Sequence, residues 1–332
     1  TFKNVSFKKR KDLINFNFLD KLSPEYRNYK IERIKNGASK KLFFKISKGS
    51  DSFVCTDFNS DKLEYKNHLV VHRILSNIDI SIPTLIEKND DKLIIVSEDF
   101  GNLRYDKILK QQSIKDLLQY ATDTLCIINK EINFNPSYAL PQYNIKLFKN
   151  EIAELPQYYF SYNNIIDRID SLNDEFFDIW IESFKQLNFN FKHFVHKDFN
   201  MNNLIFLPSR EGHLKCGVID YQNSFWGESS WDLFSLLEDS RIFFTDQYNA
   251  YFMNYFYSHS NQLISLKEFK LKYHLLNCSR QTRLLGRWVK LANELNQPWY
   301  LDFISTTKLR LQSSLAILQN NKLTKFYDKY IL

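Results

Sequence analysis

The sequence of 332 residues contains little cysteine, and the few that occur lie far apart. The four cysteines form no CxxC pair; they are Cys55, Cys126, Cys216 and Cys278. This spacing excludes a disulfide framework and a four-cysteine zinc site. Isolated cysteines are typical of a reducing compartment, so we expect a cytoplasmic protein.

Glycine and proline are also scarce, with seven of each. This low content excludes a collagen-like repeat and a low-complexity linker. Hydrophobic residues make up 44% of the chain, and aromatic residues are abundant, with 29 Phe and 19 Tyr. A chain of this length and composition can bury one large core or two smaller ones, and we expect two lobes.

Long apolar runs are missing. No uninterrupted run approaches the ~18 residues of a transmembrane helix, so we expect no membrane span. The opening segment, TFKNVSFKKRKDLINF, carries charges where a signal peptide has its apolar core. We therefore expect no secretory leader.

The chain has no block of like charges. The formal net charge is +7, but basic residues are interleaved with acidic ones along the chain. This pattern favours a solvated surface over a nucleic-acid interface, and no known nucleic-acid-binding module is present. A site for an anionic substrate would need only a few of these charges.

The first hundred residues predict a small β-rich lobe. Segment 29–47 indicates two strands around an Asn-Gly turn, and segment 51–58 indicates a third strand. Segment 61–78 has apolar residues at helical spacing, and 84–100 indicates two more strands around an Asn-Asp-Asp turn. We expect a five-stranded sheet with one helix inserted after the third strand.

A helical pattern dominates after the connector at 98–102. Amphipathic segments predict helices at 113–132, 145–160 and 173–187, and from Ser229 almost to the end. Short apolar runs around PSREGH predict a hairpin at 204–219. The expected organisation is an N-terminal lobe (1–97), a hinge (98–102) and a larger helical C-terminal lobe (103–332), an α+β protein.

The segment HKDFNMNNLIF, residues 196–206, places polar side chains between apolar runs. Asp198 and Asn203 lie five residues apart in this loop, and Asp220 ends the next strand, GVID. An aspartate can orient a hydroxyl group and take its proton. Amide and carboxylate oxygens are ligands suited to Mg²⁺. Together these groups are what phosphoryl transfer needs.

The pattern HxDxxxxN followed by an aspartate at a strand end resembles the catalytic segment of the protein-kinase-like fold. It is similar in particular to the aminoglycoside phosphotransferase and choline kinase group, because the second motif is Ile-Asp and not Asp-Phe-Gly. The segment GVIDYQNSFWGESSWDLFSLLED (217–239) closely resembles bacterial kinases that phosphorylate N-acetylmuramate and N-acetylglucosamine at C1 in cell-wall recycling.

Three further segments resemble that sugar-kinase family: SEDFG (97–101), LPQYNIKLFKNEI (140–152) and RQTRLLGRWVKLANELNQPWYL (280–301). The resemblance covers the chain from about residue 30 to about residue 315. It implies the two-lobe fold of protein kinases, with a small antiparallel N-terminal lobe.

The resemblance also implies roles for matching residues. Asp198 would be the catalytic base, and Asn203 and Asp220 would hold magnesium. His196 would support the loop, and Asp232 would accept hydrogen bonds from the loop backbone.

For the nucleotide, ATP, the resemblance implies two contact regions. The connector would offer backbone groups at Glu98 and Phe100 to adenine. The segment NGASKK (36–41) would cover the phosphates, with contacts from Gly37, Ser39, Lys40 and Lys41.

The sequence departs from the kinase pattern at the third strand. That strand reads FVCTDF, with Thr56 and Asp57 where a phosphate-binding lysine is expected. Lys40 or Lys41 on the second strand can supply the charge instead. We expect Glu64 on the inserted helix to be a poor candidate for the usual partner of that lysine.

Several of these residues have plain structural alternatives. Asp198 and Asn203 are also common turn residues, and Asp232 with Ser229 fits an ordinary helix start. Glu151 either borders the substrate cleft or belongs to the surface of a helix.

Arg280, Arg283 and Arg287 share one helix face. That face is either solvated or recognises an acidic substrate or phosphate.

The expected function is that of an ATP- and Mg²⁺-dependent kinase acting on a hydroxyl of an amino sugar, N-acetylmuramate or N-acetylglucosamine, at C1. One alternative is a kinase of the same fold for choline, homoserine or an aminoglycoside. Another is a catalytically weak scaffold, which the missing third-strand lysine supports. The expected partners are small molecules, with no nucleic acid and no membrane, and the oligomeric state is left open.

Overall fold

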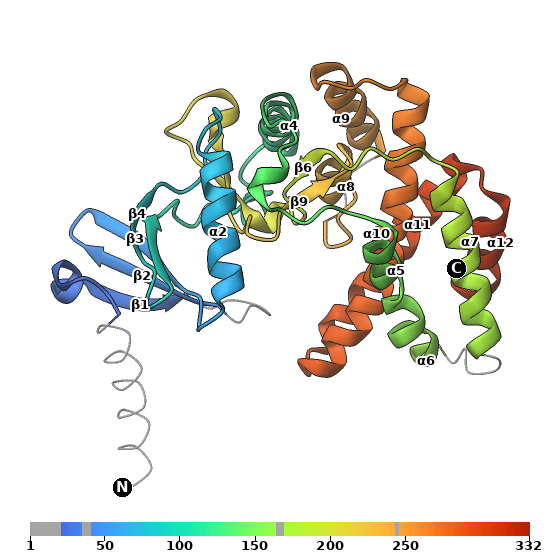
Figure 1. Cartoon of the computed structure of the whole chain (residues 1–332), viewed down its shortest axis with the longest axis horizontal. Coiled ribbons are helices and arrows are strands. Elements are labelled where there is room, and N and C mark those ends of the chain that lie inside the picture. Colours follow the sequence, from blue (N-terminus) through green and yellow to red (C-terminus); the bar gives the residue numbers. More distant parts are fainter. Residues whose placement is uncertain (1–20, 35–40, 164–168, 243–245) are drawn as a thin grey trace, which may run out of the picture.

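The computed structural model describes residues 21–34, 41–163, 169–242 and 246–332. A sheet-containing lobe lies at one end of the molecule and a helical lobe at the other, with short strand pairs and α4 between them (Figure 1). The predicted contacts at Gly37, Ser39 and Lys40 lie outside the described residues.

The N-terminal lobe contains the predicted five-stranded antiparallel sheet. Its strands are β1 (Lys30–Ile34), β2 (Leu42–Lys48), β3 (Asp51–Asp57), β4 (Leu85–Asn89) and β5 (Ile94–Glu98). They lie in the order β1-β2-β3-β5-β4. In the register of β2 and β3, Phe43 is opposite Thr56 and Leu42 is opposite Asp57.

Alternation along the strands separates two apolar clusters. Phe44, Ile46 and Cys55 are buried in one cluster. Ile95 is buried in the other, together with Tyr65 of α2 (Lys62–Leu75). The helix α2 begins at Asp61, whose carboxylate accepts the N–H of Glu64. This cap fixes the position of Glu64 in the first turn.

The C-terminal lobe is mainly helical, as predicted. Its longer helices are α4 (Ile114–Glu131), α5 (Ile145–Ile152), α7 (Ile169–Lys185), α8 (Trp231–Leu237), α9 (Asp246–His259), α10 (Leu266–Glu294), α11 (Phe303–Leu318) and α12 (Asn321–Tyr330). The central helix α10 packs against α5, α8 and α11. Large buried side chains such as Trp180, Trp231 and Tyr273 fill the core between these helices.

Two small antiparallel strand pairs carry the loops of interest. One joins β6 (His193–Val195) to β9 (Phe225–Gly227), and the other is the predicted hairpin of β7 (Leu204–Phe206) and β8 (Cys216–Val218). The chain between β6 and β7 therefore lies beside the chain between β8 and β9. The sequence did not predict β9.

The segment predicted as one helix at 145–160 is broken. It forms α5, then a π-helical turn (Leu155–Tyr159) and a last short turn, α6 (Phe160–Tyr162). Pro156 has no N–H to continue the hydrogen bonding of α5, so the single-helix prediction is wrong at this point. The π-helical turn packs on α10, where a Cβ at Gly286 would lie 1.9 Å from the carbonyl oxygen of Glu154.

None of the helices in the described ranges has the length and apolar content needed to cross a lipid bilayer.

Candidate active site

The loop after β6 is held by the carboxylate of Asp232 in α8. The backbone N–H of His196 donates to Asp232 Oδ2 (2.7 Å), and the N–H of Lys197 donates to Asp232 Oδ1 (3.0 Å). Lys197 has a φ of 82°, a left-handed conformation that is strained for a residue with a side chain. Asp232 therefore stabilises a strained turn directly before Asp198.

Burial raises the pKa of Asp232 to about 7, although the two N–H groups favour its charged form. The helix-start interpretation of Ser229 and Asp232 is wrong in detail. The N-cap residue of α8 is Ser230, and Ser229 donates to Gln262 Oε1 (3.0 Å). Asp232 is thus bonded to the loop and not to its own helix start.

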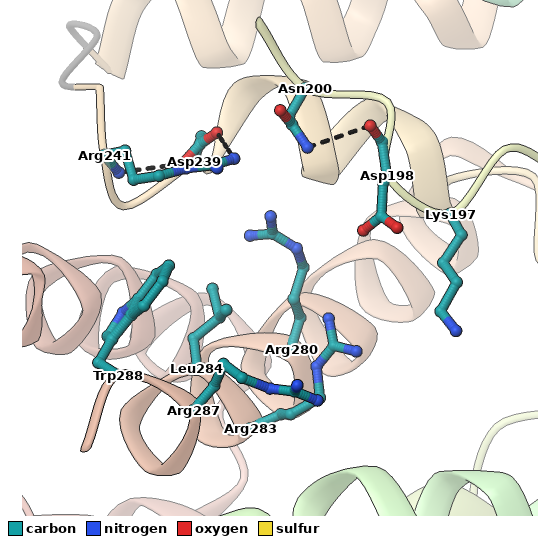
Figure 2. A pocket seen from close by; sticks show the side chains of 10 residues that line it. All are labelled: Lys197, Asp198, Asn200, Asp239, Arg241, Arg280, Arg283, Leu284, Arg287 and Trp288. Carbon is teal, nitrogen blue, oxygen red and sulfur yellow. Dashed lines mark hydrogen bonds and ion pairs between the residues drawn. The ribbon is translucent and has the colours of Figure 1, made fainter. Parts of the chain in front are cut away.

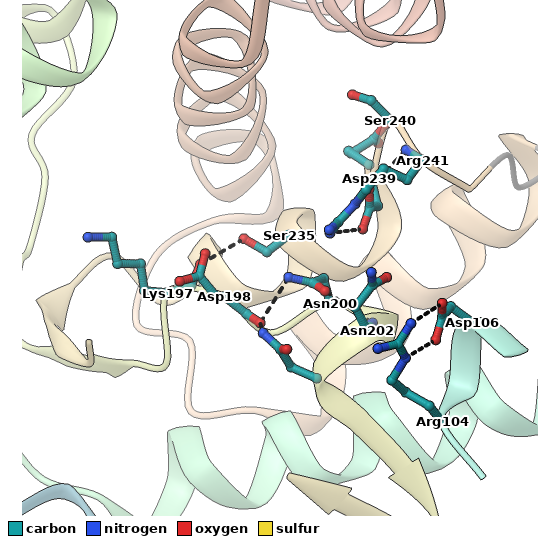
Figure 3. Close-up of polar contacts among 12 residues, drawn as sticks. Arg104, Asp106, Lys197, Asp198, Asn200, Asn202, Ser235, Asp239, Ser240 and Arg241 are labelled. Atoms are coloured by element: carbon teal, nitrogen blue, oxygen red, sulfur yellow. Dashed lines mark hydrogen bonds and ion pairs between the residues drawn. The ribbon is translucent and has the colours of Figure 1, made fainter. Parts of the chain in front are cut away.

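Two asparagines fix the backbone of Asp198. Its carbonyl oxygen accepts hydrogen bonds from Asn200 Nδ2 (3.0 Å) and Asn203 Nδ2 (2.9 Å). The hydroxyl of Ser235 donates to the carbonyl of Lys197 (Figure 3). With the backbone held in this way, the carboxylate of Asp198 extends toward a cavity (Figure 2).

The second loop is tied to the first by His196 and Asn203. The imidazole Nε2 of His196 lies 3.0 Å from the carbonyl oxygen of Ile219, and the N–H of Ile219 donates to the carbonyl of Asn203 (3.1 Å). The His196 side chain is fully buried, and burial lowers its pKa. These bonds bring Asp220 to the same cleft as Asp198 and Asn203.

Asp220 has the positive φ of 65° and faces the N-terminal lobe through Lys41. Its Oδ1 atom accepts hydrogen bonds from Lys41 Nζ (3.1 Å) and Gln222 Nε2 (3.0 Å). Burial raises the pKa of Asp220, but the charge of Lys41 and the hydrogen bonds outweigh it and hold the pKa below its usual value.

Lys41 lies between the inserted helix α2 and the loop after β8. Its ammonium group lies 3.2 Å from Glu64 Oε1 and 3.1 Å from Asp220 Oδ1, and its side chain is only 3% exposed. Contrary to the expectation that Glu64 is a poor lysine partner, Glu64 pairs with a lysine, which lies directly before β2. On β3, Asp57 is buried in an ion pair with Lys21 (2.6 Å).

Asn203 and Asp220 fit a magnesium ion. The Nδ2 atom of Asn203 is bound to the Asp198 carbonyl, which leaves its amide oxygen as the ligand atom. Asp220 supplies a carboxylate. In the described part of the chain, no group of three or more His, Cys, Asp or Glu residues is arranged so that it could hold a metal ion. One or two hard oxygen ligands suit Mg²⁺, which completes its shell with water and substrate phosphates.

Contacts with neighbouring segments hold the connector (98–102) in place. The N–H of Glu98 donates to the carbonyl of Thr84 (2.9 Å), so this amide is not offered to a nucleotide. The carboxylate of Glu98 pairs with Arg210 (2.7 Å), whose guanidinium lies 4.9 Å from the ring centre of Phe100. A Cβ at Gly217 would lie 2.7 Å from that ring, so Phe100 packs closely on β8.

A cavity of about 280 Å³ opens on the acceptor side of the catalytic loop (Figure 2). Its lining residues are Lys197, Asp198, Asn200, Asp239, Arg241, Arg280, Arg283, Leu284, Arg287 and Trp288. The three arginines that share a helix face therefore surround the same cavity as Asp198. Asp239, Arg241 and Trp288 were not predicted as site residues, although Asp239 and Trp288 lie within the segments quoted for the family resemblance.

Three of the four arginines around this cavity have carboxylate partners. Arg241 makes a two-bonded pair with Asp239, with distances of 2.9 Å and 2.7 Å. Arg283 lies 3.4 Å from Glu151 Oε1.

Arg287 is the third paired arginine, and it binds Glu154 through contacts that include an Nε to Oε2 bond of 2.8 Å. Glu151 also accepts a hydrogen bond from the hydroxyl of Tyr143 (2.7 Å), so it lies behind the cavity wall.

Comparisons with known proteins agree with this geometry. Residues 120–268, less than half of the chain, match the model of the Ecdysteroid kinase-like family. An N-acetylmuramate/N-acetylglucosamine kinase of Caulobacter vibrioides is 29% identical over 42% of this chain, and the match spans 38% of that relative. A protein of the same name from Neisseria meningitidis serogroup B is 26% identical over 70% of this chain and 68% of its own length.

Solved structures show the same fold. An ADP-bound aminoglycoside phosphotransferase, APH(2'')-Ib, has a TM-score of 0.57 at 16% identity, covering 90% of this chain and 99% of the other. An ethanolamine kinase from Plasmodium vivax also has a TM-score of 0.57, at 13% identity, with coverage of 91% and 86%. The predicted kinase-like two-lobe fold and the predicted resemblance are confirmed, and the kinase names of the relatives support a phosphotransferase.

Proposed function

Because the chain has the fold of the aminoglycoside phosphotransferases and is related to N-acetylmuramate/N-acetylglucosamine kinases, we propose that it is an ATP-dependent kinase acting on an amino sugar. The observation that carries this proposal is the position of Asp198. Its carboxylate borders an arginine-lined cavity, and its backbone carbonyl is bound by Asn203, one of the two proposed metal ligands.

In the proposed reaction, Asp198 accepts a hydrogen bond from the acceptor hydroxyl and takes its proton as the oxygen attacks the γ-phosphoryl group, while the bond from the γ-phosphorus to the β,γ-bridging oxygen breaks and ADP leaves. The fixed backbone of Asp198 keeps the carboxylate in place for this step. Asn203 and Asp220 would hold Mg²⁺, which supplies positive charge to the phosphate oxygens when bound.

Lys41 is proposed to bind the nucleotide phosphates. Its ammonium group is buried at the junction of β2, α2 and Asp220, which is where the phosphates of ATP would meet the metal ligands. The segment 36–41 and the connector 98–102 would complete the nucleotide site. With a lysine in this position, the missing third-strand lysine no longer argues for an inactive scaffold.

The cavity favours an amino sugar over a cationic acceptor. It is lined by four arginines and by the two carboxylates of Asp198 and Asp239, one of which is already paired with Arg241. Choline and aminoglycosides carry positive charge and would meet repulsion in such a site. We propose N-acetylmuramate or N-acetylglucosamine as the acceptor, with C1 as the reacting position, and a cytoplasmic location where ATP is available.

The proposal is tested by measuring ATP turnover against a panel of amino sugars, choline, homoserine and aminoglycosides, with Mg²⁺ present. The position of the new phosphate is then read by phosphorus NMR. We expect turnover with the two N-acetylated sugars and a C1 phosphate. Turnover with choline or an aminoglycoside alone would show that the proposed acceptor is wrong. A phosphate on another hydroxyl would show that the proposed C1 position is wrong.

A further inference from the structure

Arg280 differs from the other arginines around the cavity because, among the residues that the structure describes, it makes no direct ion pair with a carboxylate, although Asp239 and Asp198 are near enough to act on it electrostatically. Its Nη1 atom is buried and makes no hydrogen bond, and the residue as a whole is only 9% exposed. The guanidinium extends from α10 into the cavity between Asp198 and the Asp239–Arg241 pair (Figure 2).

A buried cation without a counter-ion is costly, and folded proteins retain one where a ligand completes the pair. Burial lowers the pKa of Arg280 to about 10, so the guanidinium is still charged at neutral pH. The charges of Asp239 and Asp198 oppose this lowering of the pKa, but both carboxylate oxygens of Asp239 already accept bonds from Arg241, and Arg280 makes no hydrogen bond to Asp239. The Nε atom of Arg283, which lines the same cavity, is a second buried donor that makes no hydrogen bond.

The location of Arg280 separates this charge from the nucleotide. The cavity is lined by Asp198, whereas Lys41, Asn203 and Asp220 are not among its lining residues. An anion bound here would therefore lie on the acceptor side of Asp198. A carboxylate matches the planar guanidinium with two parallel hydrogen bonds.

We infer that Arg280 is the specificity-determining residue for an acidic acceptor and binds its carboxylate, so that the enzyme prefers an amino sugar acid to the neutral sugar of the same ring. This inference rests on the proposed kinase function. Of the three arginines on that helix face, it selects the single one that makes no direct ion pair with a carboxylate in the described residues.

The test compares N-acetylmuramate with N-acetylglucosamine, which lacks the lactyl carboxylate, in the full chain. In Arg280→Met we expect the ratio of kcat/KM for the acid to that for the neutral sugar to fall by about ten- to a hundredfold, the range of a charge-assisted contact. Arg280→Lys keeps the charge and should restore most of the ratio. Lys290→Met removes a cation from the same helix outside the cavity and should leave the ratio within about twofold of wild type.

Two results would overturn the inference: an unchanged ratio in Arg280→Met, or equal losses for both sugars. Calorimetric titration of N-acetylmuramate without ATP provides a readout independent of catalysis, and its affinity should fall by the same factor in Arg280→Met. If wild type binds the acid but transfers phosphate to neither sugar, the proposed function fails while the carboxylate site stands. Thermal unfolding of each variant shows whether a loss of activity or binding is caused by misfolding. If Arg280→Met is misfolded, the ratio of kcat/KM values in Arg280→Lys decides whether the inference holds.

Discussion

Asp198 combines a fixed backbone with a carboxylate that borders a cavity, and its removal is the most direct test at the scale of a single residue. In Asp198→Asn we expect phosphoryl transfer to fall by at least about a thousandfold, because the amide fills the same space but cannot accept a proton. ATP binding should be unchanged, since the proposed role of this residue is to contact the acceptor and not the nucleotide. Steady-state rates and nucleotide titration measure the two quantities separately.

Asn202→Ala is a matched control for this variant, because Asn202 is a neighbour in the same loop and does not line the cavity. It should retain activity within a few-fold. Full activity in Asp198→Asn would remove this residue from the mechanism, and a parallel loss of ATP binding would indicate a damaged loop.

At this scale the sequence was enough to propose the catalytic loop, because the residues involved are local, and their roles stay predictions. Asp198 and Asn203 lie in one short segment, and Asp220 follows a recognisable strand. The ion pair of Asp239 and Arg241 could not be predicted, since its position beside Arg280 depends on how α8 and α10 pack. Lys41 and Lys40 could not be separated, because only the strand register decides which side chain enters the cleft.

At the scale of elements, we propose that the phosphate-binding lysine is Lys41, directly before β2, in place of a lysine on β3. Thr56 is opposite Phe43, so Thr56 and Lys41 lie on the same face of the sheet, one diagonal step apart. We expect Lys41→Ala to raise the KM for ATP and to lower kcat, together by a hundredfold or more in kcat/KM. The reason is the loss of a buried ammonium group beside the proposed metal ligand Asp220.

The double variant Lys41→Ala with Thr56→Lys tests the relocation itself. A lysine at position 56 would lie on the same face of the sheet as Lys41. We expect kcat/KM of the double variant to be at least about tenfold higher than that of Lys41→Ala. Lys45→Ala is the control, because Lys45 lies on β2 but pairs with Asp99 (2.8 Å). Unaltered kinetics in Lys41→Ala would show that this lysine has only a structural role.

Gly286 is required by the crossing of α10 over the π-helical turn. An alanine would normally stabilise a helix interior by about 1 kcal/mol relative to glycine. Here the added Cβ would lie 1.9 Å from the Glu154 carbonyl oxygen, so the turn must move. We expect Gly286→Ala to lower the free energy of unfolding by about 3 kcal/mol or more, and to weaken the Arg287–Glu154 pair. Urea denaturation measures the change.

Asn293→Ala on the exposed surface of the same helix is the matched control, and it should be neutral or slightly stabilising. A stabilising effect of Gly286→Ala would mean that the close approach does not exist in solution.

The elements themselves were predicted where periodicity is strong and missed where pairing is non-local. All five strands of the N-terminal sheet and the helix after the third strand were recognised from alternation and turn residues. The strand β9 has three residues and exists because it pairs with β6, about 30 residues earlier in the chain. The helix at 145–160 was predicted too long because its apolar periodicity continues across Pro156.

At the scale of the whole molecule, the proposed nucleotide contacts and the arginine-lined cavity lie in different parts of the fold. Lys41 and Glu64 connect the N-terminal lobe to Asp220, while the arginine-lined cavity lies entirely within the C-terminal lobe. A change in the orientation of the lobes would therefore alter the contacts of Lys41 at the proposed nucleotide site. It would leave the residues that line the cavity in place. This division explains why acceptor specificity can vary among proteins of one fold.

The stability of the whole chain should depend on pH through His274. This residue lies in α10, is 4% exposed, and its Nδ1 atom lies 3.1 Å from the hydroxyl of Ser314 in α11. Burial, together with the nearby charge of Lys270, lowers its pKa from 6.5 to about 4. The unfolded chain therefore binds a proton between about pH 6.5 and pH 4 that the folded chain does not, and stability falls as the pH falls through this window.

From pH 7 to pH 5, we expect His274 to contribute a loss of about 2 kcal/mol in the free energy of unfolding, measured by urea denaturation. His274→Gln should reduce that pH dependence by the same amount, because the amide does not titrate, even if the variant is less stable at pH 7. His259→Gln is the control, since His259 is exposed on α9, and it should leave the pH dependence unchanged. If the free energy of unfolding depends on pH in the same way in His274→Gln and wild type, this prediction is contradicted. The acid sensitivity would then come from carboxylates, and His274 would accept a proton in the folded protein as readily as in the unfolded chain.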